Sequence, residues 1–276
     1  MKIFRKASEL EPNLVSIKDK GQSIGLVLTM GNLHDGHLSL IREAQLHNEF
    51  VICSIFINPT QFNNENDFNS YPKTIDEDIS KLENIGCNAL FLPEVQEIYP
   101  KGLAKKKIVN NFRNILCDKF RPGHFDGVTT VVDLFFNMIK PTNSYFGEKD
   151  FQQVKIIQDL VKINHHNIKI IQCPSVRDKT GMSLSSRNSK FSNDQLKIFN
   201  VLGNKIKEHI NRLKQNEINN LDQLKIELLQ NNINKIDYLE IRNENNLEIT
   251  KNYSEARLFI ALYIGEIRII DNFKLY

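Results

Sequence analysis

Short apolar runs that alternate with helical patterns restrict the fold of this chain more than any other feature. Five runs rich in β-branched residues are predicted to be strands: Ile24 to Leu28, Phe50 to Ile57, Ala89 to Leu92, Ser144 to Phe146 and Ile168 to Gln172. Between them, apolar residues recur every three or four positions in segments 36–46, 75–85, 128–139 and 151–163, which predicts helices. Strands that are apolar on both faces and separated by helices predict an α/β fold with a doubly wound parallel sheet.

The pattern changes from about Ser175 onward. A serine-rich loop containing Gly181 leads into predicted helices at 193–214 and 221–229. Predicted strands follow near 236–241, 257–264 and 268–270, with Gly265-Glu266 as the turn between the last two. We therefore predict two domains, a larger α/β domain spanning 1–178 and a smaller α+β domain spanning 179–276.

Composition excludes several classes of protein. Of the 276 residues, 41% are hydrophobic and 25% charged, as in ordinary globular proteins, and a net charge of +3 is too small to indicate a nucleic-acid surface. The four cysteines form no Cys-x-x-Cys pair, so we expect reduced thiols in the cytoplasm. No segment approaches the ~20 apolar residues of a membrane span, and the amino terminus lacks a signal peptide's apolar stretch.

The tetrapeptide His34-Asp35-Gly36-His37 lies where the first predicted strand gives way to a helix. Two imidazoles at a helix start can direct hydrogen-bond donors at one anion, and the free backbone N–H groups of the first turn add positive potential. Gly36 allows close approach to the backbone. By itself the motif is also compatible with a metal-binding pair or with ordinary loop histidines.

Three further stretches carry donors and amides. Asn58-Pro59-Thr60-Gln61 follows the second predicted strand, and Gly147-Glu148-Lys149-Asp150 follows the fourth. The third stretch is Met182-Ser183-Leu184-Ser185-Ser186-Arg187-Asn188, in the loop before the smaller domain's first helix. Because ligands of doubly wound sheets bind beyond the carboxyl ends of the strands, these stretches predict one phosphate-binding site.

Together the four stretches resemble those of the pantoate–β-alanine ligases, or pantothenate synthetases. These belong to the nucleotidyltransferases whose His-x-Gly-His turn works with a Lys-Met-Ser-Lys-Ser-like loop, and Leu184 to Arg187 stands in the place of that loop. The resemblance extends through 123–128 and into 237–242 and 256–258, so it covers nearly the whole chain. It implies a Rossmann-like ATP- and pantoate-binding domain, a smaller domain that closes over the active site, and a homodimer.

The resemblance also implies ATP-dependent condensation of pantoate with β-alanine, with release of AMP and pyrophosphate. The pantoate carboxylate would attack the α-phosphorus of ATP to form an acyl adenylate, which the amine then attacks. Since negative charge grows on the triphosphate, fixed positive groups should stabilise the transition state. The residues that the resemblance places on ATP are Met30, Gly31, His34, His37, Gly147, Glu148, Lys149, Asp150, Val176, Leu184, Ser185, Ser186 and Arg187.

Among these, the resemblance implies catalytic roles for His37, His34, Lys149 and Arg187, with His37 as a proton donor and His34 as a phosphate contact. Judged without it, Lys149 could also be a solvated lysine at a helix start. The absence of a partnered His-Asp pair argues against Ser185 and Ser186 as hydrolase nucleophiles.

Two glutamines and two aspartates complete the predicted site. The resemblance places Gln61 and Gln153 on pantoate and β-alanine, whereas each judged singly is an ordinary surface amide. Mg²⁺ should bridge phosphate oxygens and need few protein ligands. Asp76 and Asp78 resemble the family's metal-side carboxylates, but acids placed at a helix start by the helix dipole are an equal or better explanation.

The sequence departs from the family pattern at two positions, Leu28, where proline is common, and Thr180, where an aspartate usually precedes the glycine of the mobile loop. Two other functions compete with the ligase. One is an adenylyltransferase that moves AMP onto a phosphate-bearing acceptor, and the other is a module that senses ATP without turnover.

Overall fold

The computed structural model describes residues 1–102, 106–165, 167–215 and 221–276, which form two compact units. The first unit comprises Met1–Arg113, Arg121–Glu148 and Gln153–Pro174. The second comprises Asn114–Phe120, Lys149–Gln152 and Ser175–Tyr276. Two short segments of the second unit therefore come from within the part of the sequence that otherwise builds the first.

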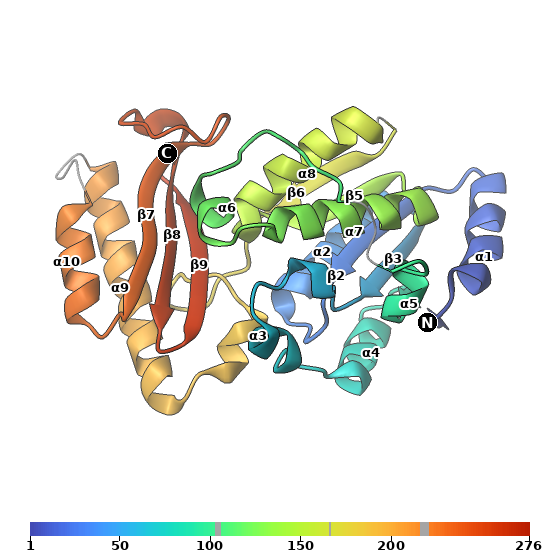
Figure 1. Ribbon diagram of the computed structural model, residues 1–276, viewed down its shortest axis with the longest axis horizontal. Helices are drawn as coiled ribbons and strands as arrows, with labels where there is room; N and C mark the ends of the chain where they lie inside the picture. The colour runs from blue at the N-terminus through green and yellow to red at the C-terminus, as the bar shows by residue number, and fades with distance from the viewer. Residues whose placement is uncertain (103–105, 166, 216–220) are drawn as a thin grey trace. The chain divides into compact units, whose positions relative to one another are not determined.

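The first unit is built on a parallel sheet of six strands in the described residues, in the order β1-β4-β3-β2-β5-β6 (Figure 1). The strands are β1 (Lys2–Phe4), β2 (Ile24–Thr29), β3 (Phe50–Ile55), β4 (Ala89–Phe91), β5 (Asn143–Gly147) and β6 (Lys169–Cys173). The predicted doubly wound sheet is confirmed. β1 was not predicted, because a strand of three residues leaves almost no periodic signal.

Helices connect the strands of the first unit. They are α1 (Ala7–Asp19), α2 (Asp35–His47), α3 (Glu65–Asn69), α4 (Ile75–Asn84), α5 (Val95–Ile98), α7 (His124–Ile139) and α8 (Phe151–Asn164), the last with its first two residues in the second unit. The 3₁₀ turns η1 (Pro59–Gln61) and η2 (Glu148–Asp150) follow β3 and β5. α4 and α7 lie on opposite sides of the sheet (Figure 1).

Side chains on the two faces of the sheet explain this layering. Val27, Cys53, Leu90 and Tyr145 are neighbours in register, are at most 1% exposed, and belong to one apolar cluster with α2 and α4. On the opposite face, the rings of Phe91 and of Phe135 in α7 meet edge to face, with centroids 5.9 Å apart. Burial of both faces accounts for strands that are apolar throughout.

β2 and β5 lie side by side although α2, β3 and β4 separate them in the sequence. Each strand runs two residues beyond the register pair Val27–Tyr145, so β2 ends at Thr29 level with the end of β5 at Gly147. Connections from β2 proceed to one side of the sheet, and those from β5 to the other. Such a reversal opens a crevice for ligands beyond the carboxyl ends of the two strands.

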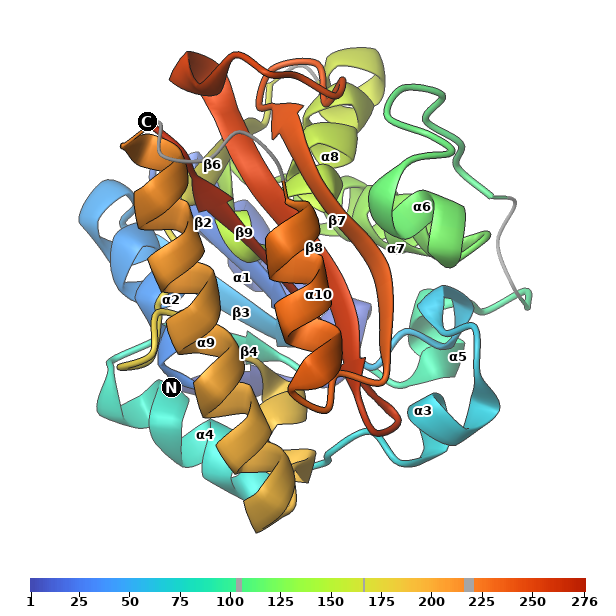
Figure 2. The same cartoon turned by 90° about the vertical axis from the view of Figure 1, so that its left-hand side faces the viewer.

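The second unit contains an antiparallel sheet of β7 (Lys235–Asn243), β8 (Ala256–Ile264) and β9 (Ile267–Lys274). Figure 2 shows α9 (Asn193–Lys214) and α10 (Asp222–Gln230) against one face of the sheet. Leu258, Ile260 and Leu262, which alternate along β8, pack into this apolar core with both helices. The predicted turn between β8 and β9 is confirmed at Gly265-Glu266, since Ile264 and Ile267 are paired.

The other face of this sheet holds the two segments that come from earlier in the sequence. Phe259 of β8 meets the Phe151 ring edge to face at 5.7 Å, and the Tyr238 hydroxyl of β7 lies 3.1 Å from Cys117 Sγ. Cys117 belongs to the short helix α6 (Leu116–Phe120). The remaining 3₁₀ turns are η3 (Ser186–Lys190) and η4 (Tyr253–Glu255). No helix among the described residues has the length and apolarity to cross a membrane.

Candidate functional site

The loop that follows β2 turns sharply at Gly31. Its φ of +83° favours glycine, and a Cβ there would lie 3.2 Å from both Asp78 Oδ2 and Ile55 Cγ2. The Gly31 N–H donates to Thr29 Oγ1 at 3.2 Å, and Thr29 Oγ1 donates to the Ser54 carbonyl. These bonds fix the direction in which the chain leaves the strand.

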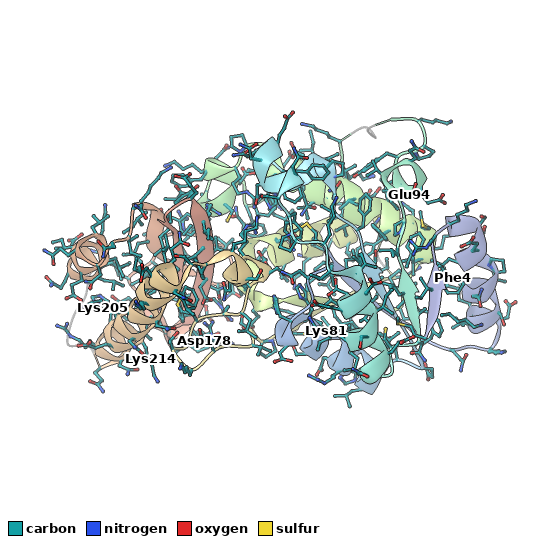
Figure 3. All side chains as sticks on the ribbon, turned by 90° about the horizontal axis from the view of Figure 1, so that it is seen from below. Phe4, Lys81, Glu94, Asp178, Lys205 and Lys214 are labelled. Atoms are coloured by element: carbon teal, nitrogen blue, oxygen red, sulfur yellow. The ribbon has the colours of Figure 1, made fainter. Side chains whose placement is uncertain are left out.

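Asp78 of α4 holds the rest of this loop. Its carboxylate is fully buried and accepts the N–H groups of Asn32 (2.9 Å, Oδ2) and Leu33 (2.7 Å, Oδ1). One helical turn later Lys81, labelled in Figure 3, donates Nζ to the Leu33 carbonyl at 2.8 Å. α4 thus satisfies both donors and acceptors of the loop, and both oxygens of Asp78 are engaged in this structural task.

His34 and His37 cap the helix α2 reciprocally. Nδ1 of His34 accepts the Gly36 N–H at 3.1 Å, and Nδ1 of His37 accepts the His34 N–H at 3.3 Å. The ring centroids are 4.1 Å apart. Because an accepting nitrogen carries no hydrogen, this network assigns the hydrogen of each neutral ring to Nε2. Both half-buried imidazoles are therefore fixed as Nε2–H donors at a helix amino terminus.

Gly36 is required for this arrangement. A Cβ at this position would lie 2.9 Å from Cε1 and Nδ1 of the His34 ring, a distance that Cβ atoms essentially never show. The predicted close approach at Gly36 is thus an approach of the His34 ring to the helix backbone. The spacing in His34-Asp35-Gly36-His37 follows from the capping geometry, in which N-cap and N3 side chains each satisfy a backbone donor.

Gln61 is held between two partners in the turn after β3. Its Nε2 lies 3.0 Å from the Met30 sulfur, and its Oε1 accepts from Asn58 Nδ2 at 3.1 Å. Asn58 is buried and also accepts from the Tyr99 hydroxyl at 2.8 Å. Burial raises the pKa of Tyr99, so its hydroxyl remains a donor. The structure thus brings together Met30 and Gln61, two predicted site residues from different strand ends.

The amino end of α7 supports this turn from behind. His124 Nδ1 donates to the Gln61 carbonyl at 2.8 Å, and His124 Nε2 lies 3.0 Å from Arg121 Nη1, from which it accepts. The Asn58 amide donates to the Gly127 carbonyl at 3.2 Å. His124 is therefore structural, because both of its ring nitrogens are engaged in holding this turn.

Replacing Gly127 with alanine is expected to destabilise the fold. Helix propensity alone would favour alanine by about 1 kcal/mol. However, its Cβ would lie 2.4 Å from the Thr60 carbonyl oxygen, a backbone atom, and overpacking of this kind costs roughly 3 kcal/mol. We expect unfolding of the variant to have its midpoint at a lower urea concentration, as measured by circular dichroism. Gly147→Ala, whose Cβ meets nothing within 4 Å, is the control; an increased midpoint for Gly127→Ala would contradict the close approach.

The carboxyl end of β5 carries the next set of predicted residues. Gly147 ends the strand, and Glu148 accepts from Gln172 Nε2 of β6 at 2.8 Å. Lys149 and Asp150 complete the turn η2 and are both half-buried. Gln153, in the first turn of α8, is half-buried as well.

In the second unit, residues 176–184 form a small hairpin. The Leu184 N–H donates to the Val176 carbonyl at 2.9 Å, so both predicted residues lie at its base. Asp178, labelled in Figure 3, accepts at Oδ1 from the Thr180 N–H and hydroxyl and from the Met182 N–H. Asp178 thus orders the turn before Gly181, and the unusual Thr180 is an additional donor to it.

Thr180 has a second contact that the sequence did not indicate. A Cβ on Gly203 of α9 would lie 2.4 Å from Thr180 Oγ1, so the small residue on the helix leaves room for the threonine. Thr180 is 4% exposed. The hairpin leads into η3, where Ser185 Oγ accepts the Arg187 N–H at 3.3 Å, and Ser186 and Arg187 are half-buried.

Metal binding by the described residues depends on how their His, Cys, Asp and Glu side chains are grouped. In the part of the chain that the structure describes, no three His, Cys, Asp or Glu side chains are grouped to hold a metal ion. Asp76 is exposed, and both oxygens of Asp78 already accept backbone N–H groups. The role of these two aspartates beside magnesium stays a prediction. Lys81 and the loop-holding task of Asp78 were missed, although an acid and a base three residues apart on one helix were visible in the sequence.

The fold and the site together indicate a class of protein. A doubly wound sheet whose switch point carries a glycine turn and a histidine-capped helix is typical of α/β proteins that bind nucleotides. A model of the pantoate-beta-alanine ligase family matches residues 2–274, and the chain belongs to that family.

Similar proteins cover the chain almost completely. "Pantothenate synthetase" of a Marinomonas species is 40% identical over 99% of both chains, and that of Francisella tularensis subsp. novicida is 44% identical over 92% of this chain and 90% of the relative. The crystal structure of the Francisella tularensis ligase, complexed with beta-gamma ATP and beta-alanine, has a TM-score of 0.86 and 39% identity, covering 100% of this chain and 98% of that one. The pantothenate synthetase of Thermus thermophilus has a TM-score of 0.86 and 31% identity, with complete coverage of both chains.

Proposed function

We propose that this chain joins pantoate to β-alanine with ATP as co-substrate, releasing AMP and pyrophosphate through a pantoyl adenylate. The observation that carries the proposal is family membership over residues 2–274, in a family whose name gives both acids. A relative with 39% identity was crystallised with beta-gamma ATP and beta-alanine, which supports the same substrates here. The reaction chemistry then has to be supplied by the residues at the strand ends.

A carboxylate is a poor acylating agent, so its activation is the demanding step. As the carboxylate oxygen bonds to the α-phosphorus, the bond to the pyrophosphate oxygen breaks and negative charge moves onto the leaving group. We assign His34 and His37 to that charge, because both rings are fixed as Nε2–H donors. Preorganised donors require no reorientation as the charge develops, which is why the capping bonds at Nδ1 matter for catalysis.

Cations and hydroxyls of the later segments extend the donor set. We assign Lys149 and Arg187 to the phosphates, together with the hydroxyls of Ser185 and Ser186 and the backbone groups of the other predicted ATP contacts. Gln61 and Gln153 are assigned to pantoate, whose carboxylate and hydroxyls suit an amide that both donates and accepts. Gln61 is held in place by Asn58.

We propose that magnesium binds together with the nucleotide, and the role of Asp76 and Asp78 beside it stays a prediction. Mg²⁺ prefers oxygen ligands, keeps several waters, and in phosphate-transfer sites is held largely by the substrate's own phosphates. The described residues contain no three-ligand group for a metal, and Asp78 is engaged with the loop after β2. No step assigned to a side chain above depends on the ion.

An AMP-release assay with each substrate omitted in turn tests the proposed function. We expect AMP only when ATP, pantoate and β-alanine are all present, and pantoate-dependent exchange of pyrophosphate into ATP without β-alanine. An adenylyltransferase would leave AMP attached to its acceptor, and an ATP sensor would release no pyrophosphate. Either result would overturn the proposal.

Replacing Gln153 with alanine is expected to raise the KM for pantoate roughly tenfold, the effect of losing one hydrogen bond of about 1.4 kcal/mol. The KM for ATP should change little. Initial rates with each substrate varied measure both constants. Gln158→Ala, five residues further along α8, is the matched control, and an equal rise in both KM values would remove Gln153 from the pantoate site.

Two further properties concern the assembly of the chain and its location in the cell. We propose a homodimer, which sedimentation equilibrium would test; a monomer at all concentrations would refute it. We also propose a cytoplasmic location, supported by four free and buried cysteines. Localisation of a tagged chain in cells would test the location.

A further inference from the structure

β9 carries two adjacent buried polar residues, Asp271 and Asn272, which are 3% and 1% exposed. In register, Asp271 lies opposite Ile260 and Asn272 opposite Phe259. Because adjacent residues of a strand point to opposite faces, the two side chains serve opposite sides of one sheet. A buried carboxylate and a buried amide each require hydrogen-bond partners to offset the loss of water.

Asp271 holds the 176–184 hairpin. Its Oδ2 accepts the Ser183 N–H at 2.7 Å and Arg177 Nη1 at 3.1 Å, and its Oδ1 accepts the Ser183 hydroxyl at 2.6 Å. The Arg177 guanidinium also stacks over Phe273 of the same strand, 4.5 Å from the ring centroid. The hairpin is therefore fixed to β9 two residues before Ser185.

Asn272 holds the turn that contains Lys149. Its Nδ2 donates to the Lys149 carbonyl at 3.1 Å, and its Oδ1 accepts from Arg257 Nη1 at 2.7 Å. Arg257 is fully buried, donates Nε to Glu244 at 3.0 Å, and lies 4.4 Å from the centroid of the Phe151 ring. Two contacts from the sheet, one polar and one cation–π, thus fix the segment that follows Glu148.

We propose that Asp271 and Asn272 are positioning residues that fix, from one strand, the two separate segments assigned to the phosphates of ATP. These segments are the Lys149 turn and the Ser185–Arg187 turn, and the inference rests on the function proposed above. Neither β9 residue is assigned a contact with substrate. Each acts through the backbone or through the hairpin that it holds.

The hydrogen bonds at position 272 can be made by an asparagine but not by an aspartate. The amide donates to the Lys149 carbonyl and accepts from Arg257 at the same time, whereas a carboxylate can only accept. Asn272→Asp therefore keeps the Arg257 contact and sets a carboxylate oxygen against the Lys149 carbonyl oxygen. The substitution removes one specific positional bond while leaving shape and burial nearly unchanged.

Pantoate-dependent exchange of pyrophosphate into ATP tests the proposal in the full-length protein. For Asn272→Asp we expect exchange to fall about 10- to 100-fold, the scale of a small misplacement of catalytic groups. Attack of β-alanine on preformed pantoyl adenylate should stay within about twofold of the unmodified rate. A folded Asn272→Asp protein with normal exchange, or with both half-reactions lowered equally, would overturn the proposal.

Asp237→Asn is the control for general damage to this sheet, because Asp237 of β7 is a carboxylate with a 1% exposed side chain. It pairs with Arg268 at 2.8 Å and, within the described residues, forms no hydrogen bond to the Lys149 turn or to the 176–184 hairpin. We expect a lower urea midpoint for this variant without a selective loss of exchange. A selective loss in the control would show that any damage to the sheet lowers exchange, which would also overturn the positioning role.

If the Asn272→Asp protein fails to fold, Ser183→Ala tests the proposal in its place. This variant removes one hydroxyl donor from Asp271, and we expect exchange to fall about three- to tenfold, the effect of one hydrogen bond. Unchanged exchange would overturn the proposal. The unmodified protein distinguishes a failure of the proposed function from a failure of this inference. If the unmodified protein shows no pantoate-dependent exchange, the proposed function itself is wrong. If exchange is normal in the unmodified protein and in the variants, only the positioning role of β9 is wrong.

Discussion

Replacing His37 with alanine is expected to lower kcat by about 10²–10⁴, the effect of removing a general acid or a preorganised transition-state donor. His37 Nδ1 accepts the His34 N–H, so the ring's hydrogen resides on Nε2 and can be offered to the leaving pyrophosphate. Steady-state AMP release measures the change. A near-normal kcat in a folded variant would remove His37 from the catalytic residues.

Two further substitutions separate the capping role of His37 from its donor role. The side-chain oxygen of asparagine can replace Nδ1 as acceptor, but asparagine provides no donor at the position of Nε2. His37→Asn should therefore have a higher free energy of unfolding than His37→Ala, while its kcat stays as low. Glutamine reaches the Nε2 position with an N–H group, and His37→Gln should recover part of the rate. His47→Ala, an exposed histidine in the last turn of the same helix, is the control.

Lys149→Ala is expected to lower pantoate-dependent exchange of pyrophosphate into ATP by about 10²–10³, as for the loss of one preorganised electrostatic group. Lys149 is half-buried two residues beyond the end of β5, and its cation is assigned to charge that develops only during adenylation. The rate of β-alanine attack on preformed pantoyl adenylate, measured in a single turnover, should be nearly unchanged.

A selective loss of the second half-reaction would contradict that assignment of Lys149. Lys162→Ala provides a matched control, because Lys162 is 76% exposed near the end of α8 and pairs with Asp159 at 3.0 Å. Lys149→Arg keeps the charge with a different geometry, and we expect it to recover part of the exchange rate.

Much of the fold could be predicted because its elements are encoded by local patterns. The strand at Ile24–Thr29 and the helix at Asn193–Lys214 were predicted within a residue of their observed ends. The helix Ala7–Asp19 was missed, although Leu10, Leu14 and Ile17 repeat at the helical spacing and are buried. Polar residues surround these three, and Pro12 lies within the helix, so the apolar signal was weak.

Some features of the candidate site could also be predicted from the sequence, and others could not. The turn at His34–His37 could be predicted because a strand end, a glycine and a helix start are adjacent in the sequence. The tautomers of the two rings, the loop-holding role of Asp78 and the contact between Gln61 and Met30 could not, since each depends on a specific atom of a partner and two of them on a partner distant in sequence.

Sequence patterns alone determined that this chain alternates strands and helices, and that histidine, lysine and amide side chains follow the strand ends, because apolar periodicity and turn residues act over a few neighbours. Only the tertiary structure decided that β2 lies beside β5, that 149–152 packs with β8 and β9, and that Asp271 and Asn272 hold two separate segments. Those outcomes depend on hydrogen bonds and packing between residues far apart in the chain, which no local pattern encodes.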